Sequence, residues 1–118
     1  MSDMLAMIRT LGEQLRWARD LELPAIAPSS ELLIGGMGGS GIAGDFAAAL
    51  SVKTPGRVAV HKGYAPLPGW ASRVGPTVIA ISYSGNTEET LSLVTAAGEA
   101  GLPVVTITTG GQLAEMSR

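Results

Sequence analysis

Two short segments carry residues whose types and spacing suit them to binding an anion. The first runs from Gly35 to Asp45, and glycine occupies six of its eleven positions. Glycine lets the backbone bring its N–H groups close to a ligand. A helix that starts here adds unpaired N–H groups and a partial positive charge. Together with the Ser40 hydroxyl, this segment is suited to holding an anion, most often a phosphate.

The second segment, residues 81–90, places three hydroxyl groups within six residues. Ser82, Ser84 and Thr87 surround the expected end of a strand and the start of a helix. An ordinary helix N-cap explains one of these hydroxyls. Three hydroxyls at a helix start favour a dianion such as a phosphate monoester. Glu88 and Glu89 follow, and we interpret them as acids of a first helical turn rather than as a catalytic base.

The glycine-rich segment can be compared with known sequence motifs for phosphate binding and for nucleophilic catalysis. The P-loop requires a lysine that is absent here, and the nucleophile elbow requires glycine where Ile42 stands. The dinucleotide fingerprint matches in spacing from Gly36, but the acid expected about 20 residues later is missing. His61 and Lys62 occupy that region and suit a phosphorylated ribose, so binding of NADP is retained as a weaker alternative.

The elements that must position these segments follow from apolar runs and from glycine and proline breaks. Strands alternate with helices, which predicts an α/β fold with a doubly wound parallel sheet in the order 2-1-3-4. The two segments then leave the carboxyl ends of neighbouring strands, at the switch point where open α/β sheets bind ligands. The expected strands are 31–35, 57–61, 77–82 and 103–108, and the expected helices are 3–19, from 40 or 41 to 50, 87–100 and one beginning at 113.

Composition narrows the function classes. The 118 residues suffice for one domain, and there is no cysteine for a disulfide or a thiolate metal site. A net charge of −2 argues against a nucleic-acid surface. No run of 18 apolar residues is present to span a membrane, and the N-terminus lacks a signal-peptide pattern. We therefore expect a cytoplasmic protein with no nucleic-acid or membrane partner.

Residues 35–45 and 81–91 together resemble the sugar isomerase (SIS) domain, a flavodoxin-like fold. More narrowly, they look like the bifunctional phosphoglucose/phosphomannose isomerases. The resemblance implies a hexose 6-phosphate substrate, no metal or nucleotide cofactor, and a homodimer in the full-length context. It also implies a role in holding the sugar phosphate for five residues, namely Gly39, Ser40, Ser82, Ser84 and Thr87.

The resemblance also indicates what to expect beyond the binding segments. Residues 1–30 form an N-terminal helix and connector, and residues 31–118 form an SIS domain without its last strand. The catalytic residues of the family lie beyond Arg118, so we expect none here. His61 is interpreted as a strand-end residue and Asp45 as turned from the ligand.

The predicted function is therefore phosphosugar binding in an aldose–ketose isomerase. Such an enzyme interconverts glucose 6-phosphate or mannose 6-phosphate with fructose 6-phosphate. The alternatives are a regulatory module that senses sugar phosphates and, less favoured, an NADP-binding domain.

Overall fold

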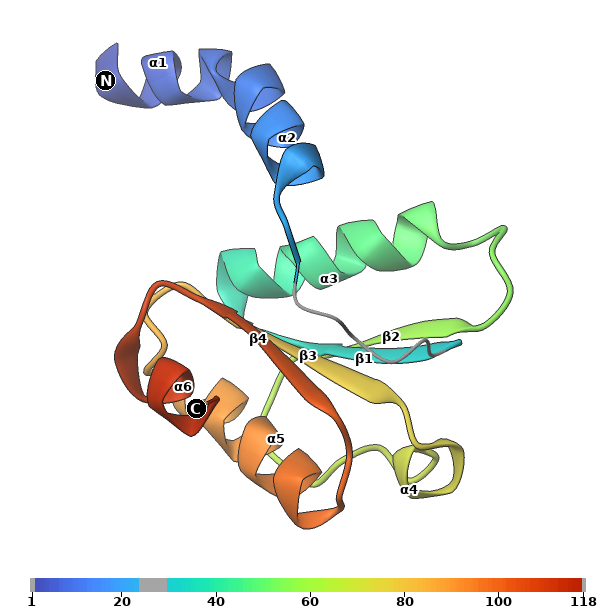
Figure 1. Ribbon diagram of the computed structural model, residues 1–118. Coiled ribbons are helices and arrows are strands. Elements are labelled where there is room, and N and C mark those ends of the chain that lie inside the picture. The colour runs from blue at the N-terminus through green and yellow to red at the C-terminus, as the bar shows by residue number, and fades with distance from the viewer. Residues whose placement is uncertain (1, 24–29, 118) are drawn as a thin grey trace.

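The computed structural model describes residues 2–23 and 30–117. Helices and strands alternate along most of this chain (Figure 1). The helices are α1 (Ser2–Arg9), α2 (Leu11–Asp20), α3 (Gly38–Leu50), α4 (Ala71–Val74), α5 (Glu88–Glu99) and α6 (Gly111–Met116). The strands are β1 (Glu31–Gly35), β2 (Arg57–His61), β3 (Thr77–Ser82) and β4 (Val104–Thr108).

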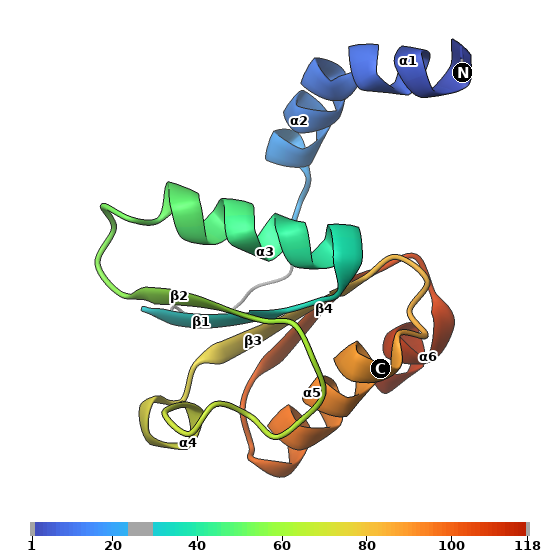
Figure 2. The same ribbon diagram turned by 180° about the vertical axis from the view of Figure 1, so that it is seen from behind.

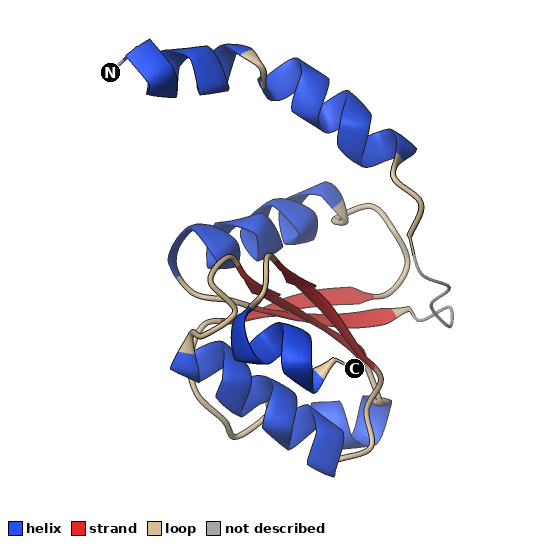
Figure 3. Ribbon diagram, turned by 60° about the vertical axis from the view of Figure 1, so that its left-hand side comes forward, coloured by secondary structure: helices blue, strands red, loops and turns tan. Residues whose placement is uncertain are grey.

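The four strands form one parallel sheet in the order β2-β1-β3-β4, which confirms the predicted α/β doubly wound fold. A row of apolar residues crosses the sheet, because Leu33 pairs with Ala59 and Val78, and Val78 pairs with Val104. Helix α3 covers one face of the sheet, and α4, α5 and α6 lie on the other (Figure 1). Figure 3 shows α5 and α6 next to each other on that second face.

The core lies between the sheet and α5. Leu33, Val78, Leu93 and Ala97 form one buried cluster, and each is at most 1% exposed. A second cluster joins α5 to α6 and consists of Ala80, Val94 and Leu113. The opposite face of β3 and β4 has a looser cover, since Ile107 is 55% exposed. The sheet is therefore anchored from the α5 side, and the other side is partly open.

Several elements differ from the sequence-based expectations, among them α6, which begins at Gly111 and not at residue 113. The helix expected over 3–19 is divided into α1 and α2 at Thr10, whose hydroxyl donates to the Met7 carbonyl at 2.7 Å. Helix α3 begins at Gly38, before the expected start at Ser40 or Gly41. The short helix α4 is an addition, since no element was expected between residues 61 and 77. The predicted proline connector falls mainly on residues 24–29, which lie outside the described residues.

Candidate functional site

The start of α3 presents backbone donors that the helix itself leaves unpaired. Met37 is extended, with φ −118° and ψ 158°, and it supplies no side-chain cap. The first intrahelical bond runs from the Gly41 N–H to the Met37 carbonyl at 3.1 Å. The N–H groups of residues 38–40 precede that bond, as in any α-helix. This helix start therefore offers donors and a partial positive charge without a competing side chain.

Close backbone approach explains why glycine is needed at two positions of this turn. A Cβ atom on Gly36 would lie 3.0 Å from the Ser40 carbonyl carbon and 3.1 Å from the Ile81 carbonyl oxygen. A Cβ atom on Gly41 would lie 2.9 Å from the Gly36 carbonyl oxygen. The turn between β1 and α3 is therefore compact, and it brings the start of α3 against the end of β3.

The start of α5 is built from hydroxyl groups instead of glycine. Thr87 occupies the N-cap position with extended backbone, but its side chain makes no capping bond. Its hydroxyl pairs with the Ser82 hydroxyl at 2.9 Å, and Ser82 also accepts the Gly85 N–H at 3.0 Å. Ser82 is only 2% exposed, so it holds the turn from inside. Ser84 is exposed, and its oxygen accepts the Asn86 N–H at 3.1 Å.

The β3–α5 turn is tied to α6. The Gly85 carbonyl accepts the Leu113 N–H at 2.8 Å, and the Asn86 side-chain oxygen accepts the Gln112 N–H at 3.0 Å. Leu113 is fully buried in the cluster that joins α6 to the sheet. The shape of the hydroxyl-bearing turn therefore depends on a segment that follows it by more than twenty residues.

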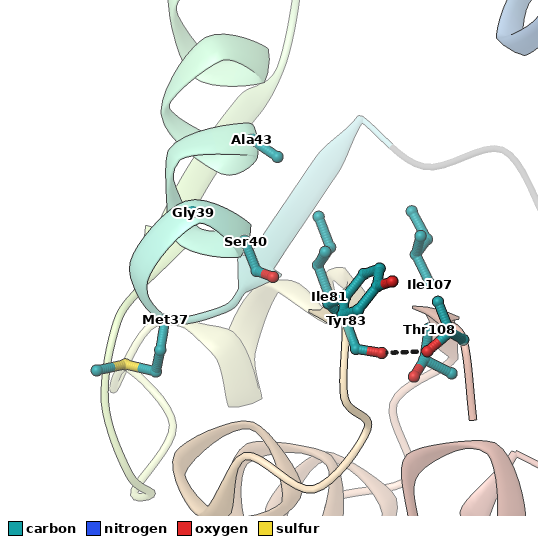
Figure 4. A pocket seen from close by; sticks show the side chains of 9 residues that line it. Met37, Gly39, Ser40, Ala43, Ile81, Tyr83, Ile107 and Thr108 are labelled. Atoms are coloured by element: carbon teal, nitrogen blue, oxygen red, sulfur yellow. Dashed lines mark hydrogen bonds between the residues drawn. The ribbon is translucent and has the colours of Figure 1, made fainter. Parts of the chain in front are cut away.

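A cavity of about 580 Å³ opens beside the start of α3, over the ends of β3 and β4. In Figure 4, the Ser40 hydroxyl points from α3 toward the side chains of Ile81 and Tyr83. The Thr109 hydroxyl donates to the Tyr83 carbonyl at 2.5 Å, which joins the two strand ends that form the cavity floor. The lining residues are Met37, Gly39, Ser40, Ala43, Ile81, Tyr83, Ile107, Thr108 and Thr109.

The structure separates the five predicted site residues into two groups. Gly39 and Ser40 line the cavity, whereas Ser82, Ser84 and Thr87 form the neighbouring turn at the start of α5. Sequence reasoning missed the contribution of β4, which supplies the lining residues Ile107 and Thr108 and is followed by a third, Thr109. The signal was available, because hydroxyl residues also follow this strand at the same edge of the sheet.

Tyr83 was also missed, although it stands inside the second motif. Its side chain is 80% exposed and forms part of the cavity wall. Tyr83 follows Ser82, whose side chain is buried toward the opposite face, so the alternation of the strand turns Tyr83 toward the α3 side. That alternation could have been read from the sequence, because the strand was already expected to end at Ser82.

The charged residues near this edge are already engaged. Lys62 donates to the Asp45 carboxylate at 2.5 Å, and the His61 ring nitrogen Nε2 lies 2.8 Å from the Tyr64 carbonyl oxygen. Asp45 is not among the residues that line this cavity. The two groups that an NADP phosphate would need, His61 and Lys62, thus have partners within the chain.

Tyr64 connects the segment after β2 to the start of α5. Its phenol donates to the Glu88 carboxylate at 3.1 Å. This hydrogen bond, followed by the negative charge of Glu89, raises the pKa of the Tyr64 phenol above its ordinary value. The neutral phenol is favoured because it alone can donate the bond.

Two further properties concern only residues 2–23 and 30–117. Within these ranges, no group of three or more histidine, aspartate or glutamate side chains is arranged to hold a metal ion. None of the helices in the same ranges has the length and apolar character to cross a bilayer.

The protein has a doubly wound parallel α/β fold, and its candidate site occupies a characteristic position in that fold. Its cavity lies at the carboxyl edge of the sheet, where β1 and β3 are neighbours and send α3 and α5 to opposite faces. This is the position at which open α/β sheets bind small molecules.

The chain is also similar in sequence to several known proteins. The chain is 40% identical over 90% of its length to the bifunctional phosphoglucose/phosphomannose isomerase of Pyrobaculum calidifontis, covering 39% of that protein. It is 41% identical over 92% of its length to the enzyme of the same name from Thermoplasma acidophilum, covering 33% of it. It is also 34% identical over 81% of its length to a D-glucosamine-6-phosphate 4-epimerase from Sulfolobus acidocaldarius, covering 30% of it.

The chain is therefore similar in sequence to part of several proteins named bifunctional phosphoglucose/phosphomannose isomerase. The chain spans between a third and two fifths of the length of these two isomerases. No family model matches the chain.

Proposed function

We propose that this chain is the phosphosugar-binding SIS domain of an aldose–ketose isomerase. The substrates are glucose 6-phosphate or mannose 6-phosphate and fructose 6-phosphate, and the reaction moves a carbonyl group between C1 and C2. Residues 31–118 form the domain, and residues 1–30 form the N-terminal helices and connector. The names of the related proteins support this choice of substrate class, since they act on phosphosugars.

One observation carries the proposal, namely that two long helices start without a side-chain cap at adjoining strand ends. Helix α3 has Met37 at its N-cap, and α5 has Thr87, whose hydroxyl is turned to Ser82. Both helix starts therefore keep N–H groups and positive partial charge for a ligand. A phosphate monoester suits such a pair of starts, because its several oxygens accept bonds from both.

In this proposal the five predicted residues have different roles in binding. Ser84 and Thr87 donate to the phosphate at the start of α5, and Ser82 holds both the turn and Thr87 in place. Gly39 and Ser40 face the cavity, which has room for the sugar carbons next to the phosphate. The exposed Tyr83 ring forms one wall of that space.

Catalysis needs a base within reach of the C1 or C2 hydrogen, about 3 Å away. Asp45 is engaged by Lys62 and lies outside the cavity, and Glu88 accepts the Tyr64 hydrogen bond. We therefore propose that this chain carries the phosphate site and lacks the catalytic residues. We further propose that the full-length protein is a cytoplasmic homodimer that requires no cofactor.

Calorimetric titration of the chain tests the binding proposal. We expect glucose 6-phosphate and fructose 6-phosphate to bind and unphosphorylated glucose to bind much more weakly. Glucosamine 6-phosphate serves as a third ligand, because one relative carries that sugar phosphate in its name. Equal affinity for glucose and glucose 6-phosphate contradicts the proposal.

Two further measurements separate the alternatives. A coupled isomerase assay should detect no turnover by the 118-residue chain. Turnover that is lost in Asp45→Asn places the catalytic base in this chain and overturns that part of the proposal. NADPH should not quench the fluorescence of Trp17 or Trp70, and micromolar binding of NADPH favours a dinucleotide-binding domain instead.

A further inference from the structure

A short segment at the end of β2 contacts both helices whose starts form the candidate site. We call residues 61–65 the strap, and Figure 2 shows this part of the chain running from the end of β2 past α5 toward α4. The His61 ring nitrogen Nε2 lies 2.8 Å from the Tyr64 carbonyl oxygen, which holds the strap in a tight turn. None of the five residues of the strap lines the cavity. Any effect of the strap on a ligand in that cavity is therefore indirect.

One end of the strap contacts the glycine-rich segment and the first two turns of α3. The Gly36 N–H donates to the His61 carbonyl at 3.2 Å. The Lys62 side chain passes so close to Gly41 that a Cβ atom there would lie 3.2 Å from the Lys62 Cε atom. The Lys62 ammonium group then donates to the Asp45 carboxylate at 2.5 Å, one turn further along α3. Lys62 thus contacts α3 with its aliphatic stem as well as with its charge.

The other end of the strap contacts the first two turns of α5. The Tyr64 phenol donates at 3.1 Å to the carboxylate of Glu88, the first residue of this helix. The Ala65 N–H donates to the hydroxyl group of Ser92, one turn later, at 3.0 Å. The strap is therefore bonded to α5 through a side chain and through its backbone.

The strap links two helices that have little other contact. Helices α3 and α5 cover opposite faces of the sheet (Figure 1), and the described residues show no extensive contact between them. The sheet holds each helix on its own face, whereas the strap bonds to both helices close to their starts. Leu67, which follows the strap, packs against the buried core cluster under α5, so the strap is anchored beyond its own hydrogen bonds.

We propose that the strap sets the separation between the starts of α3 and α5, and that Lys62 and Tyr64 are positioning residues for a sugar phosphate that contacts both starts. This inference rests on the proposed function, in which one ligand lies between the two helices. Lys62 then acts by tying the strap to α3, and it is not a cation that contacts the phosphate. A site whose two sides are already held at the right distance binds its ligand with less loss of conformational freedom.

Asp45→Asn tests the α3 end of the strap, because a tie and a simple charge effect predict opposite results. If Lys62 acted only as a cation, loss of its carboxylate partner would tighten binding of an anionic ligand. We expect weaker binding of glucose 6-phosphate by about two- to fivefold, as for loss of an exposed ion pair. Lys62→Arg keeps the pair with Asp45 and should bind like the parent chain. Calorimetric titration measures both variants, and tighter binding by Asp45→Asn overturns the proposal.

A double variant, Tyr64→Phe with Ser92→Ala, tests the α5 end without changing any charge. Both hydrogen bonds from the strap to α5 are lost, and binding of glucose 6-phosphate should weaken by about three- to tenfold. Thr95→Ala is the matched control, since this exposed hydroxyl of α5 donates to the Leu91 carbonyl within the helix. Unchanged affinity in the double variant, or an equal loss in the control, overturns the proposal.

Spin labels test the separation of the helices without any ligand. The chain has no cysteine, so Ala49→Cys on α3 and Glu99→Cys on α5 provide two exposed labelling positions. We expect a narrow distribution of distances between the labels in the parent chain. The distribution should broaden in Asp45→Asn and in the double variant of Tyr64 and Ser92, and circular dichroism checks that these variants are folded.

The labels also keep two kinds of failure apart. A parent chain that binds no sugar phosphate contradicts the proposed function, and the label distances then still decide whether the strap sets the separation of the helices. Distributions that are as narrow in the folded strap variants as in the parent chain overturn the role of the strap.

Discussion

The turns before α3 and α5 reach the same edge of the sheet by opposite chemical means. The turn before α3 removes side chains, so that backbone atoms pack against one another and N–H groups are exposed to the cavity. The turn before α5 adds hydroxyl groups that bond to each other and to the backbone. The first turn depends on close backbone packing, whereas the second combines hydrogen bonding with one tightly confined glycine, Gly85, and substitutions distinguish these contributions.

The largest effect is expected from Gly85→Ala in the hydroxyl-bearing turn. Gly85 has a φ of +74°, and an added Cβ would overlap the Gly110 carbonyl group. Strain and overlap together should lower the free energy of unfolding by about 3 kcal/mol or more. Urea denaturation measures the change. A loss below about 1 kcal/mol would mean that this turn relaxes easily, and the contrast between the turns would fail.

Ser84→Ala and Thr87→Ala test the binding role of the hydroxyl groups. Each variant should weaken binding of glucose 6-phosphate by about 1–2 kcal/mol, because a hydrogen bond to a charged phosphate is lost. Calorimetric titration provides the measurement. Ser72→Ala is the control, since this exposed serine of α4 donates to the nearby Gly69 carbonyl and does not line the cavity. Unchanged affinity in both variants contradicts the assignment of the phosphate to this turn.

Gly39→Ala separates stability from binding in the glycine-rich turn. An added Cβ meets nothing within 4 Å, and Gly39 is not in the left-handed region. Helix stability should therefore rise by up to about 1 kcal/mol. The new methyl group enters the cavity, so sugar-phosphate affinity should fall. Gly98→Ala in α5 also meets open space and should stabilise without any change in affinity. If Gly39→Ala binds as well as the parent chain, the ligand lies elsewhere.

The smallest effect is expected from Tyr64→Phe and depends on pH. The folded chain raises the pKa of Tyr64 above its ordinary value of 10.0, so the bond to Glu88 stabilises the fold below that pH. The contribution is lost as the pH rises through the raised value. The difference in melting temperature between parent and variant should be constant well below pH 10.0 and should disappear once the pH exceeds the raised pKa. A difference that grows with pH would reverse the assigned direction.

The sequence predicted those parts of the fold that depend on local patterns. Strands β1, β2 and β3 were placed at their observed bounds, because each is an apolar run bounded by glycine, proline or polar residues. The sheet order followed from the expectation that the chain is doubly wound. Helix α3 was started too late, since glycine disfavours helix and only tight packing on the sheet allows one to begin at Gly38.

The candidate site was harder to predict because it depends on register across several strands. Gly39 and Ser40 were identified from their segment, and the structure places them on the cavity. Tyr83 and Thr108 join them only because β3 and β4 end side by side, with Ser82 paired to Thr108. The hydrogen bond between the Ser82 and Thr87 hydroxyls also depends on the geometry of the turn between them, which cannot be read from the sequence.

The anchoring of the β3–α5 turn by α6 has a thermodynamic consequence. The turn keeps its shape through the bonds that Leu113 and Gln112 donate to it, so opening of α6 and loosening of the turn are one event. A ligand that requires the ordered turn must therefore also favour the docked form of α6. Occupancy at the sheet edge would then slow the amide hydrogen exchange of Gln112 and Leu113, on a segment that does not line the cavity. Hydrogen exchange in α6 would therefore show whether a ligand occupies the site, because α6 helps to hold the turn that forms it.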